Sequence, residues 1–420
     1  MIEVSRRNNE RAILAALNTK ELSREIVEEH LDELEELALT AGAETIIKII
    51  QDRFAIDSAY YIGKGKAEEL AQLVELNEID LVIFDDDLTP VQVRNLEKLI
   101  NKKILDRSGL ILDIFASRAK TKEAKTQVEL AQLQYMLPRL TRAWTHLSKQ
   151  YGGIGTKGPG ETQIETDRRI IRTRISHLKD KLGKIEAQRE TQTSGRKDFI
   201  KISLVGYTNA GKSTLFNTLT NAGVFAEDKL FATLDSTTRT LDLGRKEKML
   251  ISDTVGFIRK LPPHLVASFK STLNEVRDAD IILHVIDITH DYFEDHLQVV
   301  ESTLKDLKVE GKIIIKVFNK IDSLKEKSRM DFVRNKYKNS VLISAARGIN
   351  LSSLKNKITA EVENSFIEEN VDLNLADSKT AAQIYSLAEV VSTKYDDKIH
   401  ITYRTNKRNS EKIKKIIYGG

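Results

Sequence analysis

The chain has no cysteine, only 5 Pro and 20 Gly in 420 residues, and no long hydrophobic run. Without cysteine it can form no disulfide framework, thiolate nucleophile or Cys-ligated zinc site, which excludes a small disulfide-bonded secreted domain. The low Gly and Pro content and the 40% hydrophobic residues exclude collagen-like and fully disordered chains.

No apolar run approaches the roughly 20 residues that cross a bilayer. The first ten residues are polar, include Arg6 and Arg7, and are not followed by an apolar stretch, so they do not resemble a signal peptide. We therefore expect a folded, cytoplasmic protein without membrane insertion, although peripheral association with a membrane stays open.

The net charge of +4 is unevenly distributed. Residues 118–184 carry 15 Lys and Arg against 6 Asp and Glu, residues 394–420 carry 8 against 3, and the remainder has a net charge of −10. Two basic segments in an otherwise acidic chain favour local contact with a polyanion such as nucleic acid, but solvated basic helices give the same pattern.

The length predicts about three domains of roughly 150 residues. Strand and helix patterns alternate up to residue 116, which predicts a small, largely parallel α/β domain over residues 1–116. A helical pattern over 119–149, a glycine-rich loop over 152–160 and a second helix after it predict an antiparallel helical hairpin over residues 117–192.

The polar segment Glu190–Lys197 is expected to be a linker. Strands and helices alternate again over residues 198–365, which predicts a second α/β domain. Residues 366–420 predict a small α+β domain that includes a helix over Lys379–Val391.

A strand expected over Ile200–Val205 runs into the pattern G-x-x-x-x-G-K-S at residues 206–213, which is typical of a phosphate-binding loop. Glycines let successive backbone N–H groups turn towards phosphate oxygens at the start of a helix, whose dipole favours anions. Lys212 would neutralise the β- and γ-phosphates, and the Ser213 hydroxyl is a suitable Mg²⁺ ligand. The expected contacts are Gly206, Tyr207, Thr208, Asn209, Ala210, Gly211, Lys212, Ser213 and Thr214.

A second motif, D-x-x-G, follows the strand expected over Lys248–Ser252 and comprises Asp253, Thr254, Val255 and Gly256. In this position Asp253 can hold a Mg²⁺-bound water, while the Gly256 N–H can meet the γ-phosphate. The motif is weak by itself, because acidic turns with glycine are common.

A third motif, N-K-x-D, follows the strand expected over Lys312–Phe318 and comprises Asn319, Lys320, Ile321 and Asp322. A carboxylate only accepts hydrogen bonds, so Asp322 can bind N1–H and the exocyclic amine of guanine but offers nothing to the bare N1 of adenine. After the last strand, the backbone of Ser344, Ala345 and Ala346 can reach the guanine O6. GTP is therefore favoured over ATP.

These motifs have the order and spacing of a GTPase, and ligands of open α/β sheets bind at the carboxyl ends of the strands. The chain also resembles the HflX-type GTPases over about residues 11–365. The resemblance rests on Phe231-Ala232-Thr233-Leu234-Asp235 as switch I, on the signature at residues 152–169 and on residues 61–66. Ser236 stands where that family is expected to have proline.

The resemblance implies a P-loop GTPase domain preceded by a small α/β domain with a helical hairpin and followed by a small α+β domain. It implies that Thr233 joins Ser213 and Asp253 as a Mg²⁺ ligand and that Phe231–Asp235 close over GTP. Asn209 is similar to the phosphate-loop asparagine of potassium-stimulated GTPases, so K⁺ is a further expected cofactor. The catalytic candidates are Lys212, Thr233, Gly256 and Asn209.

Glutamine usually orients the attacking water after the D-x-x-G glycine, but Phe257 occupies that position here. An aromatic ring cannot orient water by hydrogen bonding, so slow intrinsic hydrolysis is expected.

The resemblance further implies a monomeric protein that binds the 50S subunit and its 23S rRNA and dissociates stalled or idle 70S ribosomes under stress. A glycine-rich tip flanked by arginines suits close approach to an RNA backbone, although it could equally be a connector that only needs to turn. The RNA-contact candidates are Gly152, Gly153, Lys157, Arg168, Arg169 and Arg172.

Two other functions remain open at this point. One is an RNA-remodelling NTPase that also uses ATP through the N-terminal domain, although no second G-x-x-x-x-G-K-[ST] pattern occurs in the chain. The other is a non-catalytic ribosome assembly factor that senses GTP and acts by binding alone.

Overall fold

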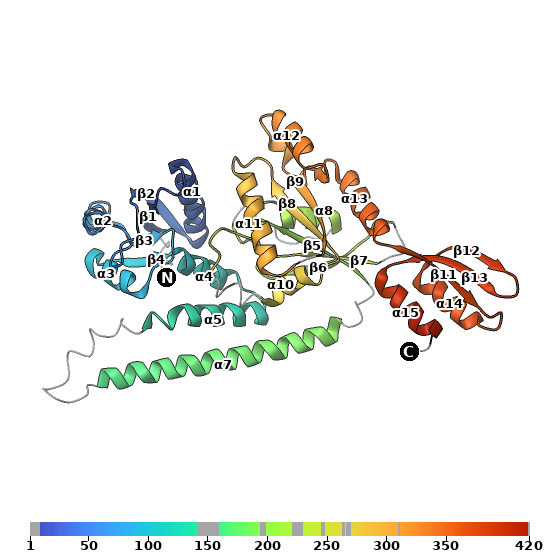
Figure 1. Ribbon diagram of the computed structural model, residues 1–420. Coiled ribbons are helices and arrows are strands. Elements are labelled where there is room, and N and C mark those ends of the chain that lie inside the picture. Colours follow the sequence, from blue (N-terminus) through green and yellow to red (C-terminus); the bar gives the residue numbers. More distant parts are fainter. Residues whose placement is uncertain are drawn as a thin grey trace, which may run out of the picture.

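The computed structural model describes residues 9–140, 159–193, 199–220, 230–244, 248–262, 265, 270–309 and 311–418. The α/β class is confirmed: the described strands form a four-stranded, a six-stranded and a three-stranded sheet. Figure 1 shows these sheets side by side, with the long helix α7 running beneath the first two and the C-terminal part at one end. Among the described helices, none combines the length and the apolar character that a bilayer span requires.

The N-terminal sheet is entirely parallel and has the strand order β2-β1-β3-β4. Residues 12–17 of β1 are buried, as expected for an inner parallel strand covered on both faces. The elements of this domain are β1 (Glu10–Asn18), α1 (Arg24–Ala41), β2 (Ala43–Asp52), α2 (Lys64–Leu76), β3 (Leu81–Phe84), α3 (Pro90–Ile100), β4 (Lys103–Asp106) and α4 (Arg107–Arg118).

Local sequence sets the ends of these helices. The Ser23 side chain accepts from the backbone N–H of Ile26 at the start of α1, and Gly42 ends that helix in the left-handed region at φ 91°. Thr89 and Gln92 form a capping box at the start of α3. These caps orient the helices over the sheet.

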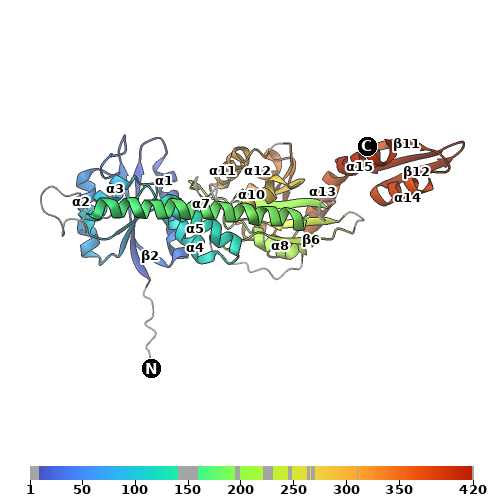
Figure 2. The same ribbon diagram turned by 90° about the horizontal axis from the view of Figure 1, so that it is seen from below.

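Helices α5 (Lys122–Met136) and α7 (Pro159–Thr193) lie side by side and run in opposite directions (Figures 1 and 2). Leu178 of α7 is fully buried, and Arg174 pairs with Glu129 across the two helices at 2.6 Å. Helix α7 continues to Thr193, so the first half of the expected linker is helical. No glycine or proline follows Gly183 until Gly195, which explains why the helix runs on.

The central sheet has the order β10-β9-β8-β5-β7-β6 and is parallel except for the edge strand β6. One of its faces packs on α8 and α13 in a common core that includes Phe216 and Leu354. Its elements are β5 (Ile200–Gly206), α8 (Lys212–Thr220), β6 (Thr237–Leu241), β7 (Met249–Asp253), α10 (Lys270–Arg277), β8 (Ile281–Asp287), α11 (Phe293–Asp306), β9 (Ile313–Asn319), the 3₁₀ turn η3 (Ile321–Ser323), α12 (Ser328–Lys336), β10 (Ser340–Leu342) and α13 (Leu351–Asn364).

The other face belongs to a hydrophobic core that continues into the N-terminal domain. This cluster includes Leu34 and Phe115 from the first domain, Phe231 and Phe257 from the segments beside the central sheet, and Val300 of α11. The two sheets are therefore joined by shared apolar packing as well as by the chain.

The C-terminal sheet is antiparallel with the order β11-β13-β12. The prediction of a helix over Lys379–Val391 was wrong at its end, because α14 stops at Leu387 and residues from Glu389 onward pair with β13. The run Val390, Val391, Ser392 and Thr393 contains three β-branched residues, which favour a strand. The elements are β11 (Ile367–Leu373), α14 (Ser378–Leu387), β12 (Glu389–Tyr395), β13 (Ile399–Thr405) and α15 (Lys407–Tyr418).

Candidate nucleotide-binding site

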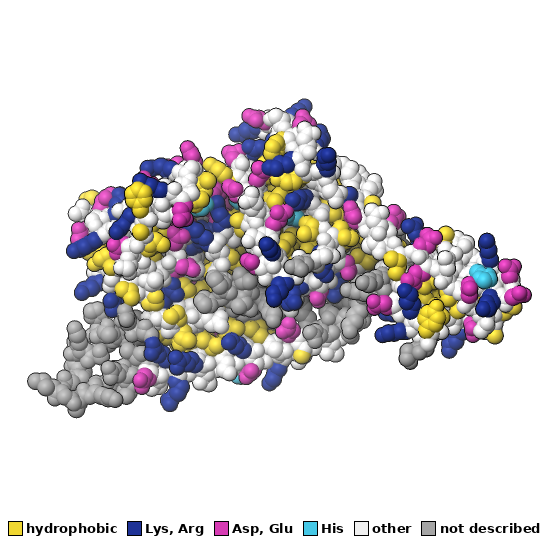
Figure 3. Space-filling model, in the orientation of Figure 1, with side chains coloured by type: hydrophobic (Ala, Val, Ile, Leu, Met, Phe, Trp, Pro, Cys, Tyr) yellow, Lys and Arg dark blue, Asp and Glu magenta, His cyan; other side chains and the backbone are white. Residues whose placement is uncertain are grey.

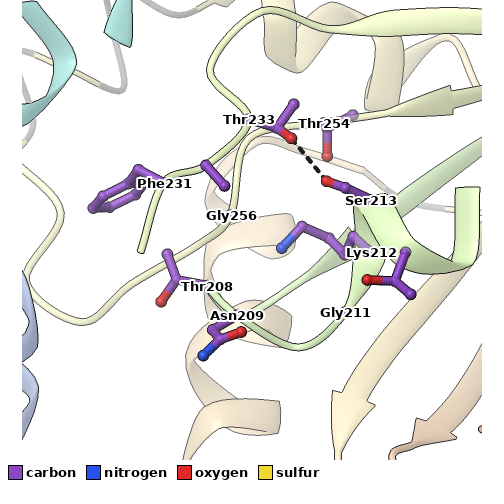
Figure 4. A pocket seen from close by; sticks show the side chains of 11 residues that line it. Thr208, Asn209, Gly211, Lys212, Ser213, Phe231, Thr233, Thr254 and Gly256 are labelled. Atoms are coloured by element: carbon purple, nitrogen blue, oxygen red, sulfur yellow. Dashed lines mark hydrogen bonds between the residues drawn. The ribbon is translucent and has the colours of Figure 1, made fainter. Parts of the chain in front are cut away.

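The loops that follow strands β5, β7 and β9 meet at one edge of the central sheet, as expected for an open α/β sheet. A cavity at this edge is lined by backbone and side chains of three predicted segments, the phosphate loop, switch I and D-x-x-G (Figure 4). The lining residues are Thr208, Asn209, Gly211, Lys212, Ser213, Thr214, Phe231, Ala232, Thr233, Thr254 and Gly256.

The phosphate loop has the backbone that its glycines permit. Gly211 has φ +88°, and a Cβ there would lie 2.3 Å from Nδ2 of Asn319. A Cβ on Gly206 would lie 2.2 Å from the carbonyl oxygen of Val285. Asn209 adopts φ 58°, a conformation that asparagine tolerates better than most residues. The loop therefore lies against β8 and the N-K-x-D segment without room for larger residues at the two glycines.

Lys212 is buried at the start of α8, and its side chain reaches into the cavity (Figure 4). Its Nζ donates to the carbonyl oxygens of Tyr207 at 2.7 Å and Gly206 at 3.2 Å. Burial lowers the pKa of Lys212 to about 8, against the opposing attraction of Asp253. A bound anion would favour the charged form, so this ammonium group is suited to binding phosphate.

Three side-chain oxygens gather beside Lys212. Ser213 Oγ donates to Asp253 Oδ2 at 2.6 Å and lies 2.7 Å from Thr233 Oγ1. Asp253 Oδ1 is buried and has no hydrogen-bond partner among the described residues, and burial raises the pKa of Asp253 despite the Ser213 hydrogen bond and Lys212. A hard divalent cation prefers such oxygen donors, so the three side chains fit a Mg²⁺ site.

The D-x-x-G segment is joined to the phosphate loop by backbone hydrogen bonds. The Thr208 N–H donates to Phe257 O at 2.8 Å, and the Phe257 N–H donates to Gly206 O at 3.0 Å. A Cβ on Gly256 would lie 2.9 Å from Cα of Thr208, so glycine is required there for the close approach. Thr254 donates to Leu204 O at 2.6 Å, and Val255 is buried.

The N-K-x-D segment is linked to both neighbouring loops through Asn319. Its Nδ2 donates to Ala210 O at 3.0 Å, and its Oδ1 accepts from the Ala345 N–H at 2.9 Å. Lys320 pairs with Asp287 at 2.8 Å. Asn319 therefore connects three of the predicted motifs.

The guanine-reading candidates differ in exposure. Asp322 is exposed, and a hydrogen bond from Ser344 lowers the pKa of its carboxyl, so it is ionised and open to a ligand. Ser344 and Ala345 are buried, Ile321 is half-buried and Ala346 is exposed. The carboxylate is thus in the state that the predicted base recognition requires.

The switch I residues do not all face the cavity. Thr233 faces Ser213, whereas the Phe231 ring packs edge-on against Phe115 at 4.6 Å. Leu234 is buried in the core shared with the N-terminal domain, and the Asp235 carboxylate contacts the start of α5. Leu234 and Asp235 are therefore not brought to the cavity.

The predicted RNA contacts lie far from this cavity in the sequence and are only partly described. Gly152, Gly153 and Lys157 lie outside the described residues. Arg168, Arg169 and Arg172 lie on α7, where the last two are exposed. Figure 3 shows basic side chains gathered along this part of α7.

An ion-pair network between the N-terminal domain and the central sheet was missed by the sequence reasoning. Arg107 at the start of α4 is buried and pairs with Glu33 of α1 and with Asp85 at the end of β3. Arg259 and Lys260, just after D-x-x-G, pair with Glu29 at 2.6 Å and with Asp85 at 2.5 Å respectively.

Tyr207 of the phosphate loop takes part in the same network. Its hydroxyl donates to Glu33 and accepts from the Arg259 N–H at 2.9 Å. The acidic run Asp85–Asp87 was the sequence signal available for this network, but it was interpreted only as the end of a strand.

Glu29, His290 and His296 also lie within ligand distance of one another between the two domains. His290 Nδ1 accepts from the Tyr292 N–H at 3.1 Å, so its Nε2 carries the proton in the neutral ring. Burial alone would raise the pKa of Glu29, but His296 and Arg259 outweigh it and lower the pKa to about 2. These groups satisfy one another, and the arrangement is that of an interdomain hydrogen-bonded contact.

A phosphate loop, an oxygen cluster for a divalent cation and an N-K-x-D segment at the carboxyl edge of this sheet define a P-loop GTPase. Comparison with known families agrees. Residues 28–116 match the family described as "GTP-binding GTPase N-terminal", residues 118–196 "GTP-binding GTPase Middle Region", and residues 201–320 "50S ribosome-binding GTPase".

The relatives specify the family further. GTPase HflX of Flavobacterium psychrophilum is 52% identical over 77% of this chain and 78% of its own length. GTPase HflX of Magnetococcus marinus is 44% identical over 94% and 91%, and that of Escherichia coli is 43% identical over 86% of both. The chain belongs to the HflX family of GTPases and hydrolyses GTP, which confirms the resemblance seen in the sequence.

Solved structures with a similar fold include a GTP-binding protein from the archaeon Sulfolobus solfataricus in complex with GDP. It is 27% identical, with a TM-score of 0.44, and the match covers 84% of this chain and 98% of that one.

Proposed function

We propose that this GTPase is a Mg²⁺-dependent switch that binds the 50S subunit in its GTP state and dissociates stalled or idle 70S ribosomes under stress, as a cytoplasmic monomer. The observation that carries the switch is the position of Thr233, whose hydroxyl meets Ser213 beside Asp253. The match of residues 201–320 to a 50S ribosome-binding GTPase supports the partner.

Co-sedimentation tests both halves of this proposal. The purified chain is mixed with 50S, 30S or 70S particles in GDP or in a non-hydrolysable GTP analogue. The expected result is association with 50S particles in the analogue and loss of 70S particles in a sucrose gradient. Equal binding to 30S and 50S particles, or no dependence on the nucleotide, would contradict it.

The oxygen cluster would hold the metal. Ser213 and Thr233 would supply hydroxyl ligands, and Asp253, whose Oδ1 has no partner in the described part of the chain, would hold a metal-bound water. A bound Mg²⁺ neutralises charge on the β- and γ-phosphates. A loop that is closed only while Thr233 binds the metal would open once the γ-phosphate is lost.

Hydrolysis needs help from outside the side chain that follows D-x-x-G. Phe257 is 1% exposed, donates its N–H to Gly206 and cannot orient water with its ring. We therefore infer that a partner or a K⁺ ion near Asn209 adds positive charge in the transition state. The rate of phosphate release should be higher in KCl than in NaCl at equal ionic strength; equal rates would argue against K⁺.

Asp322→Asn is expected to weaken GTP binding by at least about a hundredfold, because two charged hydrogen bonds to guanine are lost. The amide can instead pair with xanthine, so the variant should gain affinity for xanthosine triphosphate. Calorimetric titration with both nucleotides measures the change. Asp331→Asn, an exposed carboxylate of α12, is the control. An unchanged preference for guanine would show that the base is read elsewhere.

Arg168→Ala with Arg169→Ala should reduce affinity for 50S particles without reducing GTP affinity, because these side chains lie on α7 and not at the nucleotide cavity. Contact through RNA phosphates predicts a salt dependence whose slope falls by about 1 for each lost contact.

The matched control removes the same charge further along α7, with Lys181→Ala and Lys184→Ala, both exposed. Equal losses in the two double variants would mean that the hairpin binds by general charge rather than through the tip. In that case Gly152, Gly153 and Lys157 would be connector residues.

The two alternative functions predict other results. Competition by ATP for the GTP site, or a second site for ATP, would favour an RNA-remodelling NTPase. The N-terminal segment that resembles the family, residues 61–66, begins with Tyr61, which is buried and donates to Asp86, and therefore has a structural role. Phosphate release that ribosomes do not stimulate would favour a GTP-sensing assembly factor.

A further inference from the structure

We propose that switch I clamps the root of the helical hairpin, through Asp235 on α5 and Phe231 on α4, so that the nucleotide state controls how firmly the hairpin is held. This inference rests on the proposed nucleotide switch. It assigns Asp235 a positioning role toward α5 in place of the contact with GTP that the sequence suggested.

The Asp235 carboxylate is bound to the first turn of α5. Oδ2 accepts from the backbone N–H groups of Lys120 at 3.2 Å and Thr121 at 3.3 Å, and Oδ1 accepts from the Thr121 hydroxyl at 2.5 Å. Thr121 is also the N-cap of α5, since its Oγ1 accepts from the Ala124 N–H at 3.0 Å. A negative charge at a helix N-terminus is favoured by the helix dipole and by the free N–H groups there.

Phe231 provides a second contact with the same root. Its ring packs edge-on against Phe115 at 4.6 Å and 87°, and both rings are 2% exposed. Phe231 itself has φ 54°, which a bulky residue adopts only when its surroundings enforce it. Switch I is thus held at two points on the segment that joins α4 to α5.

The metal cluster lies on the opposite side of the same five residues. Thr233 Oγ1 is 2.7 Å from Ser213 Oγ, while Asp235, two residues later, binds α5. Leu234 between them is 2% exposed, so the segment has little room to move at one end without moving at the other. Opening of the Thr233 contact would therefore withdraw Asp235 and Phe231 from the hairpin root.

The hairpin can carry this change toward its tip, because α5 and α7 pack along each other and Glu129 binds Arg174. Coupling of this kind is reciprocal: a partner that fixes the hairpin would favour the nucleotide that closes switch I.

Hydrogen exchange on the full chain tests the clamp. In the wild type, the backbone amides of residues 120–128 should exchange at least about fivefold more slowly with a non-hydrolysable GTP analogue than with GDP. Asp235→Asn should abolish most of that difference and leave affinity for the analogue within about twofold. The control is Asp242→Asn, an exposed carboxylate after β6 that accepts from Gly244, and it should keep the difference.

The outcomes separate this inference from the proposed function. If residues 230–235 are protected by the analogue but residues 120–128 exchange equally in both nucleotides, the clamp is wrong and the switch stands. If Asp235→Asn changes exchange by the same factor in both states, Asp235 is only a structural cap and the clamp is also wrong. If the analogue binds but protects neither segment, the switch itself is wrong.

Discussion

Lys212→Ala is expected to lower the rate of GTP hydrolysis by about a hundred- to a thousandfold, the range found when one positioned donor to developing charge is removed. Lys212 is the buried ammonium group in the cavity, and burial lowers its pKa to about 8 without an anion present. A bound triphosphate compensates that burial, and alanine would leave the phosphates without this charge. Phosphate release under single-turnover conditions measures the effect.

The control for this prediction is Lys201→Ala. Lys201 lies on β5, the strand that leads into the phosphate loop, and is only loosely paired with Asp278 at 4.0 Å. It should retain the wild-type rate. A Lys212→Ala variant that is folded by circular dichroism and hydrolyses GTP within tenfold of the wild type would remove the cavity from consideration as the active site.

Arg107→Met is expected to destabilise the N-terminal domain by about 3–5 kcal/mol, because it leaves buried carboxylates without their cation. Arg107 is 1% exposed and binds Glu33, Asp85 and the carbonyl oxygen of Arg259. Asp85 would still have Lys260, so the largest cost falls on Glu33. Denaturant unfolding followed by hydrogen exchange in β1 and β3 measures the loss.

Two further measurements define the mechanism. Glu33→Gln in the Arg107→Met background should restore part of the lost stability, whereas Arg94→Met on the exposed side of α3 should change stability by less than about 0.5 kcal/mol. Equal effects of Arg94→Met and Arg107→Met would show that the buried pair contributes nothing specific.

Acid should act on the same network. Burial alone would raise the pKa of Glu33, but Arg107 and Arg259 outweigh it and the pKa is lowered in the fold. A carboxyl group with a lowered pKa stabilises the fold above its unfolded pKa, and that stability is lost as the pH falls towards the folded pKa. Arg107→Met should therefore weaken this part of the acid dependence.

The sequence predicted the strands and helices that position the nucleotide site because their signals are local. The phosphate loop, D-x-x-G and N-K-x-D are each contiguous, and each follows a strand of buried residues. The errors arose where local signals compete: Glu389–Tyr395 follow a helical pattern but pair with β13, and α7 continues into residues that looked like a linker.

The amino-acid order alone determined the chemistry of the site, because the residues that chelate phosphate and read guanine must lie at fixed short spacings. Only the tertiary structure decided how the domains act on that site. Arg107 meets Glu33 across 74 residues and Arg259 across 152, and Asp235 meets Thr121 across 114. Such contacts follow from the packing of separate sheets on a shared core, which no local spacing encodes.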